Sequence, residues 1–131
     1  MSILTEISIG EFLDKLTILQ IKSERISDET GQRNIHKEMK ILESTWNESG
    51  RSREPITMEL RELREVNETL WEIEDKLRGK EARKEFDNEF VELARSVYLT
   101  NDRRAQIKKT INTKLDSALV EEKRYSDYKR S

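Results

Sequence analysis

The sequence predicts an all-α protein, a bundle of four to five helices in which two form a long antiparallel hairpin. Four glycines and one proline in 131 residues leave few positions that interrupt a helix. Apolar residues recur every three or four positions over most of the chain, which is the spacing of one helix face. We expect a single domain over residues 1–131, with residues 1–8 and 120–131 loosely ordered and a short extended segment allowed at the N-terminus.

The composition of the chain excludes several classes of protein and of binding site. Charged residues make up 40% of the chain but nearly cancel to a net charge of −2, so there is no overall attraction for nucleic acid or anionic membranes. The absence of cysteine excludes disulfides and thiolate sites, and the single histidine, His36, excludes a multi-histidine metal site within one chain. No apolar run approaches the roughly 20 residues that span a bilayer, and no leader segment is recognisable. We therefore expect a cytoplasmic protein without a membrane partner, with His36 on its surface.

The first helix is predicted from its start signal. Ser8 and Glu11 have the S-x-x-E spacing of a capping box, in which each side chain satisfies a backbone N–H at the helix start. The apolar stripe that follows consists of Phe12, Leu16, Leu19 and Ile26, with Leu13 beside it. We expect this helix to end within residues 27–31. Before it, Ile3, Thr5, Ile7 and Ile9 alternate as in a short strand.

The same periodicity predicts three further helices. One covers residues 33–47, and the strongest pattern, with heptad-like leucine spacing, covers residues 56–78. Pro55 is expected in the first turn of that helix and Gly79 is expected to stop it. The last helix begins near Phe86, and residues 99–102 either end it or bend it before the stripe resumes at Ile107.

Residues 8–19, with the sequence SIGEFLDKLTIL, form a distinctive opening signature of the type S-x-G-E-[FL]-[LIV]-D-K-[LI]-T-I-L. Further stretches are LWEIED at 70–75, LARSVY at 93–98, ND at 101–102, IK at 107–108 with IN at 111–112, and VEEK at 120–123. In these residues the chain resembles a small all-helical family of bacteria and their phages, known as a domain of unknown function. Residues 33–54 are the least similar. The resemblance implies that some relatives are encoded near cell-surface glycan genes, and it carries over no catalytic residues.

Carboxylates spaced three apart suggest one chemical function. Glu72 and Asp75 share a face of the third helix, and Glu89 and Glu92 share a face of the fourth. Such pairs on facing helices hold Mg²⁺ in all-α nucleotide phosphohydrolases, although the order of the two pairs is reversed here. In a chain with 27 acidic residues the simpler interpretation is a solvated charged face. No other cofactor is predicted.

Two stripes of the third helix suggest binding instead of catalysis. Its acidic edge (Arg61, Glu65, Glu68, Glu72 and Asp75) could face a basic edge of the first helix (Lys15, Lys22 and Arg25), either as charge-matched packing or around a polar ligand. The other stripe consists of Asn67, Trp71, Glu74 and Arg78. Trp71 is either a partly buried core residue or an anchor for a partner protein. Asn67 lies on an apolar seam, where it either sets the oligomeric state or marks an exposed edge.

The only dense basic cluster, at residues 103–109, contains Arg103, Arg104, Lys108 and Lys109. It suggests a third function, binding of an anion or nucleic acid through Arg95, Arg103, Arg104 and Lys108. No aromatic platform accompanies it, so nucleic acid is not the expected partner. The sequence favours a helical interaction module that associates with itself, as a dimer, or with another protein, and no catalytic arrangement is evident. The metal-dependent enzyme and the anion binder remain as alternatives.

Overall fold

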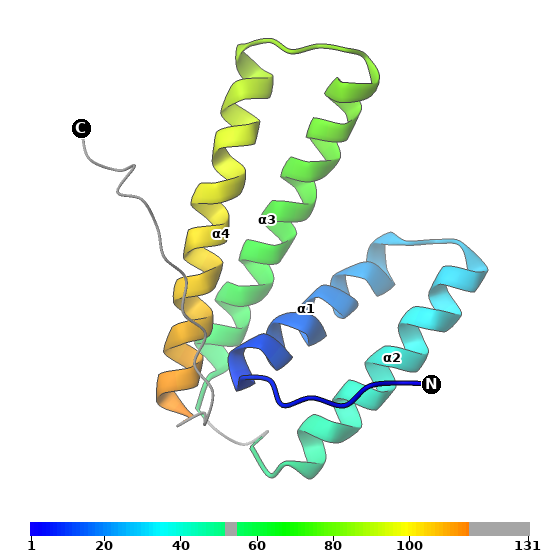
Figure 1. Cartoon of the computed structure of the whole chain (residues 1–131), viewed down its shortest axis with the longest axis vertical. Coiled ribbons are helices and arrows are strands. Elements are labelled where there is room, and N and C mark those ends of the chain that lie inside the picture. The colour runs from blue at the N-terminus through cyan, green and yellow to red at the C-terminus, as the bar shows by residue number, and fades with distance from the viewer. Residues whose placement is uncertain (52–54, 116–131) are drawn as a thin grey trace.

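The computed structural model describes residues 1–51 and 55–115, and this part of the chain contains four α-helices. They are α1 (Ile9–Arg25), α2 (Glu29–Glu48), α3 (Thr57–Ala82) and α4 (Asn88–Lys114). α3 and α4 form a long antiparallel hairpin, and α1 and α2 form a shorter hairpin beside its lower half (Figure 1). The predicted all-α class and the long hairpin are therefore confirmed. The segment 120–131, expected to be loosely ordered, lies outside the described residues.

Three helices begin where a side chain caps a free backbone N–H. Ser8 Oγ accepts a hydrogen bond from Glu11 N at 3.1 Å, which confirms that half of the predicted capping box. Asp28 caps α2 through Gly31 N at 2.8 Å, so α2 begins at Glu29 and not at residue 33 as predicted. α1 ends at Arg25, slightly before the predicted range, and Ile26 follows it with an extended backbone. Asp87 caps α4 through Phe90 N at 2.9 Å.

The boundaries of α3 differ from those predicted. Gly79 does not stop the helix, which continues to Ala82. The chain reverses only at Lys84, which has a φ of 56°. Pro55 lies before Ile56, the N-terminal flanking residue, and not in the first turn. α4 runs unbroken through residues 99–102, so these residues do not end the helix.

The N-terminal alternation does not produce a strand. Residues 1–8 have no regular secondary structure, and the side chains of Ile3 and Leu4 are 89% and 96% exposed. An isolated strand needs a neighbour to satisfy its backbone groups, and no strand is present in residues 1–51 and 55–115 to provide one.

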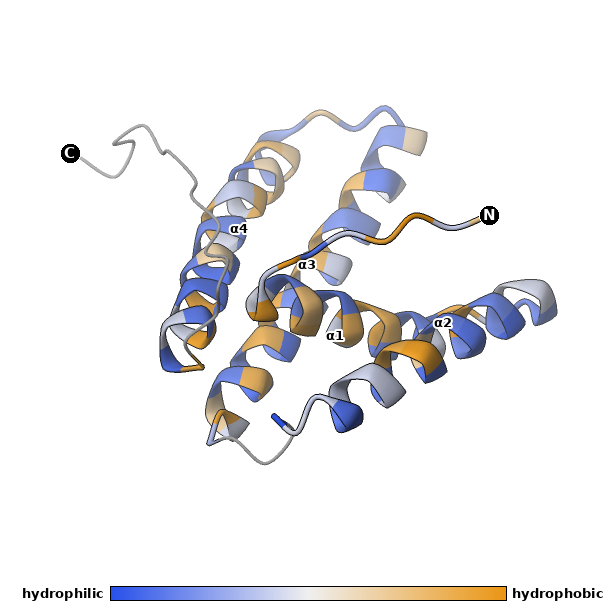
Figure 2. Ribbon diagram, turned by 60° about the horizontal axis from the view of Figure 1, so that its bottom comes forward, coloured by the Kyte–Doolittle hydropathy of each residue, from blue (hydrophilic) through white to orange (hydrophobic). Residues whose placement is uncertain are grey.

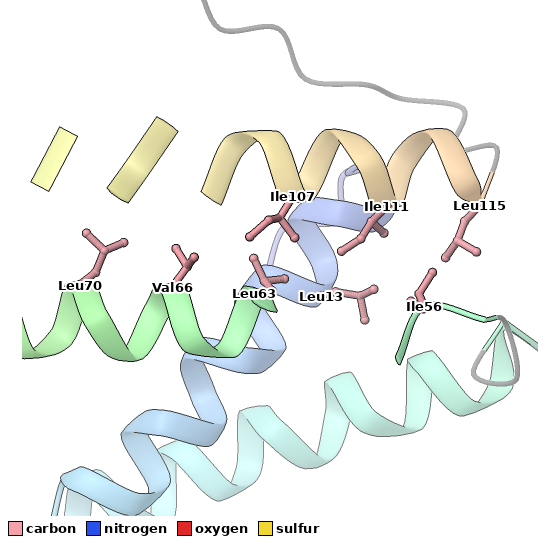
Figure 3. Close-up of a cluster of buried hydrophobic side chains, with 8 residues drawn as sticks. All are labelled: Leu13, Ile56, Leu63, Val66, Leu70, Ile107, Ile111 and Leu115. Carbon is pink, nitrogen blue, oxygen red and sulfur yellow. The ribbon is translucent and has the colours of Figure 1, made fainter. Parts of the chain in front are cut away.

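The core lies where α1 crosses the lower half of the α3–α4 hairpin. Leu63 faces Ile107 across the hairpin, and Leu13 of α1 lies beside Leu63 and opposite Ile111 (Figure 3). Leu63 and Ile111 are fully buried. The cluster also contains Ile56, Val66, Leu70, Ile107 and Leu115. α2 packs against α1 alone among the helices, and hydrophilic residues predominate along it (Figure 2). None of the described helices is both long and apolar enough to cross a membrane.

Ion pairs join α3 to α4 at both ends of the hairpin. At the upper end the buried amine of Lys80 contacts the Asp87 carboxylate at 3.0 Å. The hydrogen bond to Asp87 raises the pKa of Lys80. Donation from Phe90 N and then from Lys80 lowers the pKa of Asp87. At the lower end Lys114 binds Glu59 and lowers its pKa.

Candidate functional site

A polar cluster is buried among the apolar residues where α1, α3 and α4 meet. Its centre is Asp14 of α1, which is only 4% exposed. Asp14 Oδ1 accepts a hydrogen bond from Asn67 Nδ2 of α3 at 2.8 Å. Two cations of α4 approach its other oxygen, Lys108 Nζ at 3.7 Å and Arg104 Nε at 4.0 Å. A carboxylate at this depth is tolerated because opposite charge and hydrogen bonding compensate its lost hydration.

Lys108 links this cluster to the first turn of α1. Its amine also forms an ion pair with Glu11, the residue whose backbone N–H is capped by Ser8. One turn further along α4, Asn112 Oδ1 accepts a hydrogen bond from Gly10 N at 2.7 Å. Gly10 allows this contact because a Cβ there would lie 2.7 Å from the carbonyl oxygen of Lys108. The signature residues at the start of α1 are therefore those that contact α4.

Asp14 was not among the predicted site residues, although the sequence carried a signal for it. Gly10, Asp14, Thr17 and Ile21 follow helical spacing and are all buried. The predicted apolar stripe, which contains Phe12, Leu16 and Leu19, lies on a neighbouring side of the same helix. A carboxylate within a buried stripe marks a position that needs polar partners from other helices.

A pocket of about 480 Å³ opens beside the polar cluster, between α1, α3 and α4. All four residues of the predicted stripe, Asn67, Trp71, Glu74 and Arg78, line it. Arg104 lines it as well, so Asn67 and Arg104 belong to both the pocket and the polar cluster. The remaining lining residues are Ile18, Ile21, Lys22, Leu70, Asp75 and Asn101. Its volume is within the range of small-molecule sites in proteins.

The hydrogen bonds of Asn67 are internal to one chain. Its side chain is 5% exposed, it donates to Asp14, and its Oδ1 lies 3.5 Å from Arg104 Nη1. Asn67 thus does not lie at an exposed edge. Trp71 is half-buried, with the indole forming part of the pocket wall.

The predicted facing of charged edges between the first and third helices is confirmed at one pair. Arg25 Nη1 lies 2.6 Å from the Glu72 carboxylate. The other two basic residues of this edge, Lys15 and Lys22, do not pair with the acidic edge of α3. Lys15 lies near Glu11 on its own helix, and Lys22 lines the pocket.

The four carboxylates of the proposed metal site are not brought together. Glu72 is engaged by Arg25 of α1, Glu89 approaches Lys80 at 3.6 Å, and Glu92 pairs with Arg95. Across residues 1–51 and 55–115, no group of three or more histidine, aspartate or glutamate side chains is arranged to hold a metal ion. The geometry of the described chain therefore gives the phosphohydrolase interpretation no support.

The predicted basic cluster is divided between two sides of α4. Arg103 is exposed, and Arg95 is exposed and pairs with Glu92. Arg104 and Lys108 are instead turned toward Asp14, inside the bundle. These four residues do not form a continuous basic surface of the kind that follows a nucleic-acid backbone. His36 is on the surface, as predicted.

The fold and site define a helical-bundle protein in which a buried polar cluster adjoins an open pocket, without an evident catalytic arrangement among the described residues. The model of the Family of unknown function (DUF6165) matches residues 3–129, and the chain belongs to this family. No curated protein and no solved structure matches the chain.

Proposed function

We propose that this protein is a non-catalytic interaction module that associates with a second copy of itself through the upper half of the α3–α4 hairpin. The observation that carries this proposal is apolar surface on that half of the hairpin. Phe86, Val91, Tyr98 and Leu99 are between 43% and 58% exposed, and we call these four residues the hairpin face.

The two halves of the hairpin differ in how well their apolar residues are covered. In the lower half, where α1 packs across the hairpin, Leu63, Val66 and Ile111 are at most 1% exposed. In the upper half, Phe90 and Leu93 remain only partly buried because the described chain places no third helix over them (Figure 1). Two helices cannot bury a stripe from all sides, and packing against a further element is the usual solution.

A second copy supplies such an element without any other partner. Val91 and Tyr98 are seven residues apart, so they lie on the same side of α4 and form a short seam, in which the exposed side chain of Arg95 lies between them. Two hairpins placed face to face would bury these seams in a four-helix arrangement.

The mass of the protein in solution tests this proposal, measured by size-exclusion chromatography with light scattering over a range of concentrations. We expect a mass near twice the 15.6 kDa of one chain at high concentration. The double variant Val91→Glu, Tyr98→Glu places two charges in the seam and should be monomeric. The matched control is Ile41→Glu, which alters an apolar side chain of α2 that is 60% exposed and should leave the dimer intact.

A monomeric wild-type protein at all concentrations would refute self-association. A dimer that survives the double variant would refute the hairpin face as its interface. Trp71→Ala should leave the dimer intact, because Trp71 lines the pocket and does not belong to the hairpin face.

A further inference from the structure

The pocket between α1, α3 and α4 is lined by three cations and by the two carboxylates of Glu74 and Asp75, so its lining has a small excess of positive charge. Three of its lining residues are the cations Lys22, Arg78 and Arg104. Lys22 and Arg78 make no ion pair within residues 1–51 and 55–115. This contrasts with Arg25, Arg64 and Lys80, which all have carboxylate partners at 3.0 Å or closer.

Arg104 is held in place from one side and has hydrogen-bonding capacity to spare. A guanidinium has five N–H donors in one plane. Within the described chain it makes one hydrogen bond, at the long distance of 3.5 Å to Asn67 Oδ1, and its Nε lies 4.0 Å from Asp14. Its side chain is 31% exposed, and it lines the pocket. The polar cluster thus orients a guanidinium whose remaining donors are available to a planar or tetrahedral oxyanion.

The other walls of the pocket suit the uncharged part of a small molecule. The indole of Trp71 offers a flat surface on which a ring can stack. Glu74, Asp75 and Asn101 provide oxygen atoms that accept hydrogen bonds from hydroxyl groups. Glu74 and Asp75 make no ion pair in the described chain. Ile18, Ile21 and Leu70 supply apolar contact.

We propose that this pocket binds a small phosphate ester of a hydroxyl-bearing ring, with the phosphate at Arg104, Lys22 and Arg78 and the ring against Trp71. This ligand chemistry is shared by sugar phosphates and nucleotides. The site is independent of the hairpin face, because none of the four residues of that face lines the pocket. It assigns a role to Arg104 that differs from nucleic-acid binding, since the partly buried guanidinium lines a pocket and is not part of a continuous basic surface.

Isothermal titration calorimetry of the full chain tests the proposal, with glucose 1-phosphate, adenosine monophosphate, inorganic phosphate and adenosine as separate titrants. At least one of the two esters should bind, more tightly than inorganic phosphate, and adenosine alone should bind at least tenfold more weakly than its monophosphate. Which ester binds better distinguishes a sugar phosphate from a nucleotide. Affinity should fall as salt is added, because the phosphate is held by charge.

Matched variants locate the site. Arg104→Gln should weaken ester binding about tenfold or more, because it removes a charged hydrogen-bond donor. Arg103→Gln is the control, since it removes the neighbouring arginine of α4, which is exposed and does not line the pocket. Because Arg104 also approaches Asp14, the double variant Lys22→Gln, Arg78→Gln provides a test that leaves the polar cluster intact. Trp71→Leu should weaken ester binding while leaving inorganic phosphate unchanged.

Several results would overturn the proposal. Absence of binding by both esters at millimolar concentration is the simplest of them. Binding that is unaffected by the Lys22 and Arg78 double variant, or that falls equally with Arg103→Gln, would show that the pocket is not the site. None of these outcomes bears on the mass of the protein, so a failure to bind the esters would not contradict the proposed self-association. Conversely, a monomeric protein would not contradict ligand binding in the pocket.

Discussion

Gly10 and Asn112 are 102 positions apart in the sequence, yet the backbone N–H of Gly10 donates to Asn112 Oδ1 at 2.7 Å. This hydrogen bond joins the first turn of α1 to the end of α4 at a point where both residues are buried. It requires a backbone approach that only glycine permits at position 10. We expect Gly10→Ala to lower the free energy of unfolding by roughly 1–3 kcal/mol, because the added Cβ would meet the Lys108 carbonyl oxygen at 2.7 Å.

Urea denaturation measures this change, and Gly79→Ala is its control. At Gly79, in the interior of α3, an added Cβ meets only the end of the flexible Arg83 side chain at 3.3 Å. Alanine is also the better helix former by about 1 kcal/mol, so this variant should be as stable as wild type or slightly more stable. Equal effects of the two substitutions would contradict the close approach of α1 to α4.

Removal of the Asp14 carboxylate should destabilise the protein strongly. Asp14→Ala leaves Asn67 Nδ2 without its acceptor and two nearby cations without their buried counter-charge. We expect a loss of about 3 kcal/mol in the free energy of unfolding. A double-mutant cycle between Asp14→Ala and Asn67→Ala should show a coupling on the order of 1 kcal/mol, since the two side chains share one hydrogen bond. Additive losses would show that the pair does not interact in solution.

Asp87 has two separate roles at the upper end of the hairpin, and two substitutions separate them. Asp87→Asn keeps a good capping side chain for α4 but loses the ion pair with Lys80. Asp87→Ala loses both. We expect thermal unfolding to show a lower Tm for the asparagine variant and a further decrease for the alanine variant. Identical Tm values for the two variants would contradict the contribution of the cap.

Glu59 should make stability depend on pH in the acidic range. Its pKa in the folded protein lies below the ordinary value of 4.5, because Lys114 donates a hydrogen bond to the carboxylate. The folded state therefore favours the charged form of Glu59. The resulting contribution to the free energy of unfolding is present above pH 4.5 and is lost as the pH falls through the lower folded-state pKa. Glu59→Gln should reduce the slope of unfolding free energy against pH below about 4.5. An unchanged slope in urea titrations across this range would contradict the pairing.

The helices could be predicted from the sequence because their signals are local. Ser8 marks the start of α1, and the apolar periodicity of α3 is continuous over many turns. The errors arose where two local signals compete. Gly79 resembles a helix stop, yet the chain turns only at Lys84. With this longer α3, Asp87 both caps α4 and forms an ion pair with Lys80.

The candidate site was predicted only in part, because some of its residues are far apart in the sequence. Asn67, Trp71, Glu74 and Arg78 share one side of a single helix, so their spacing was enough to group them. That this side faces a pocket, and that Arg104 completes it, depends on how α1 and α4 pack against α3. No local pattern encodes those crossings. The Asp14–Asn67 contact spans 53 positions and becomes visible only in three dimensions.

The attachment of α2 to α1 alone has a consequence for how this chain can change over evolution. A substitution in α1, α3 or α4 disturbs two or three neighbours at once, whereas a substitution in α2 has to be accommodated at a single interface. α2 can therefore drift in sequence at little expense to the other three helices. It occupies Glu29–Glu48. Sequence divergence within the family should concentrate on this helix, while the turns around Gly10, Asp14 and Asn112 stay constant.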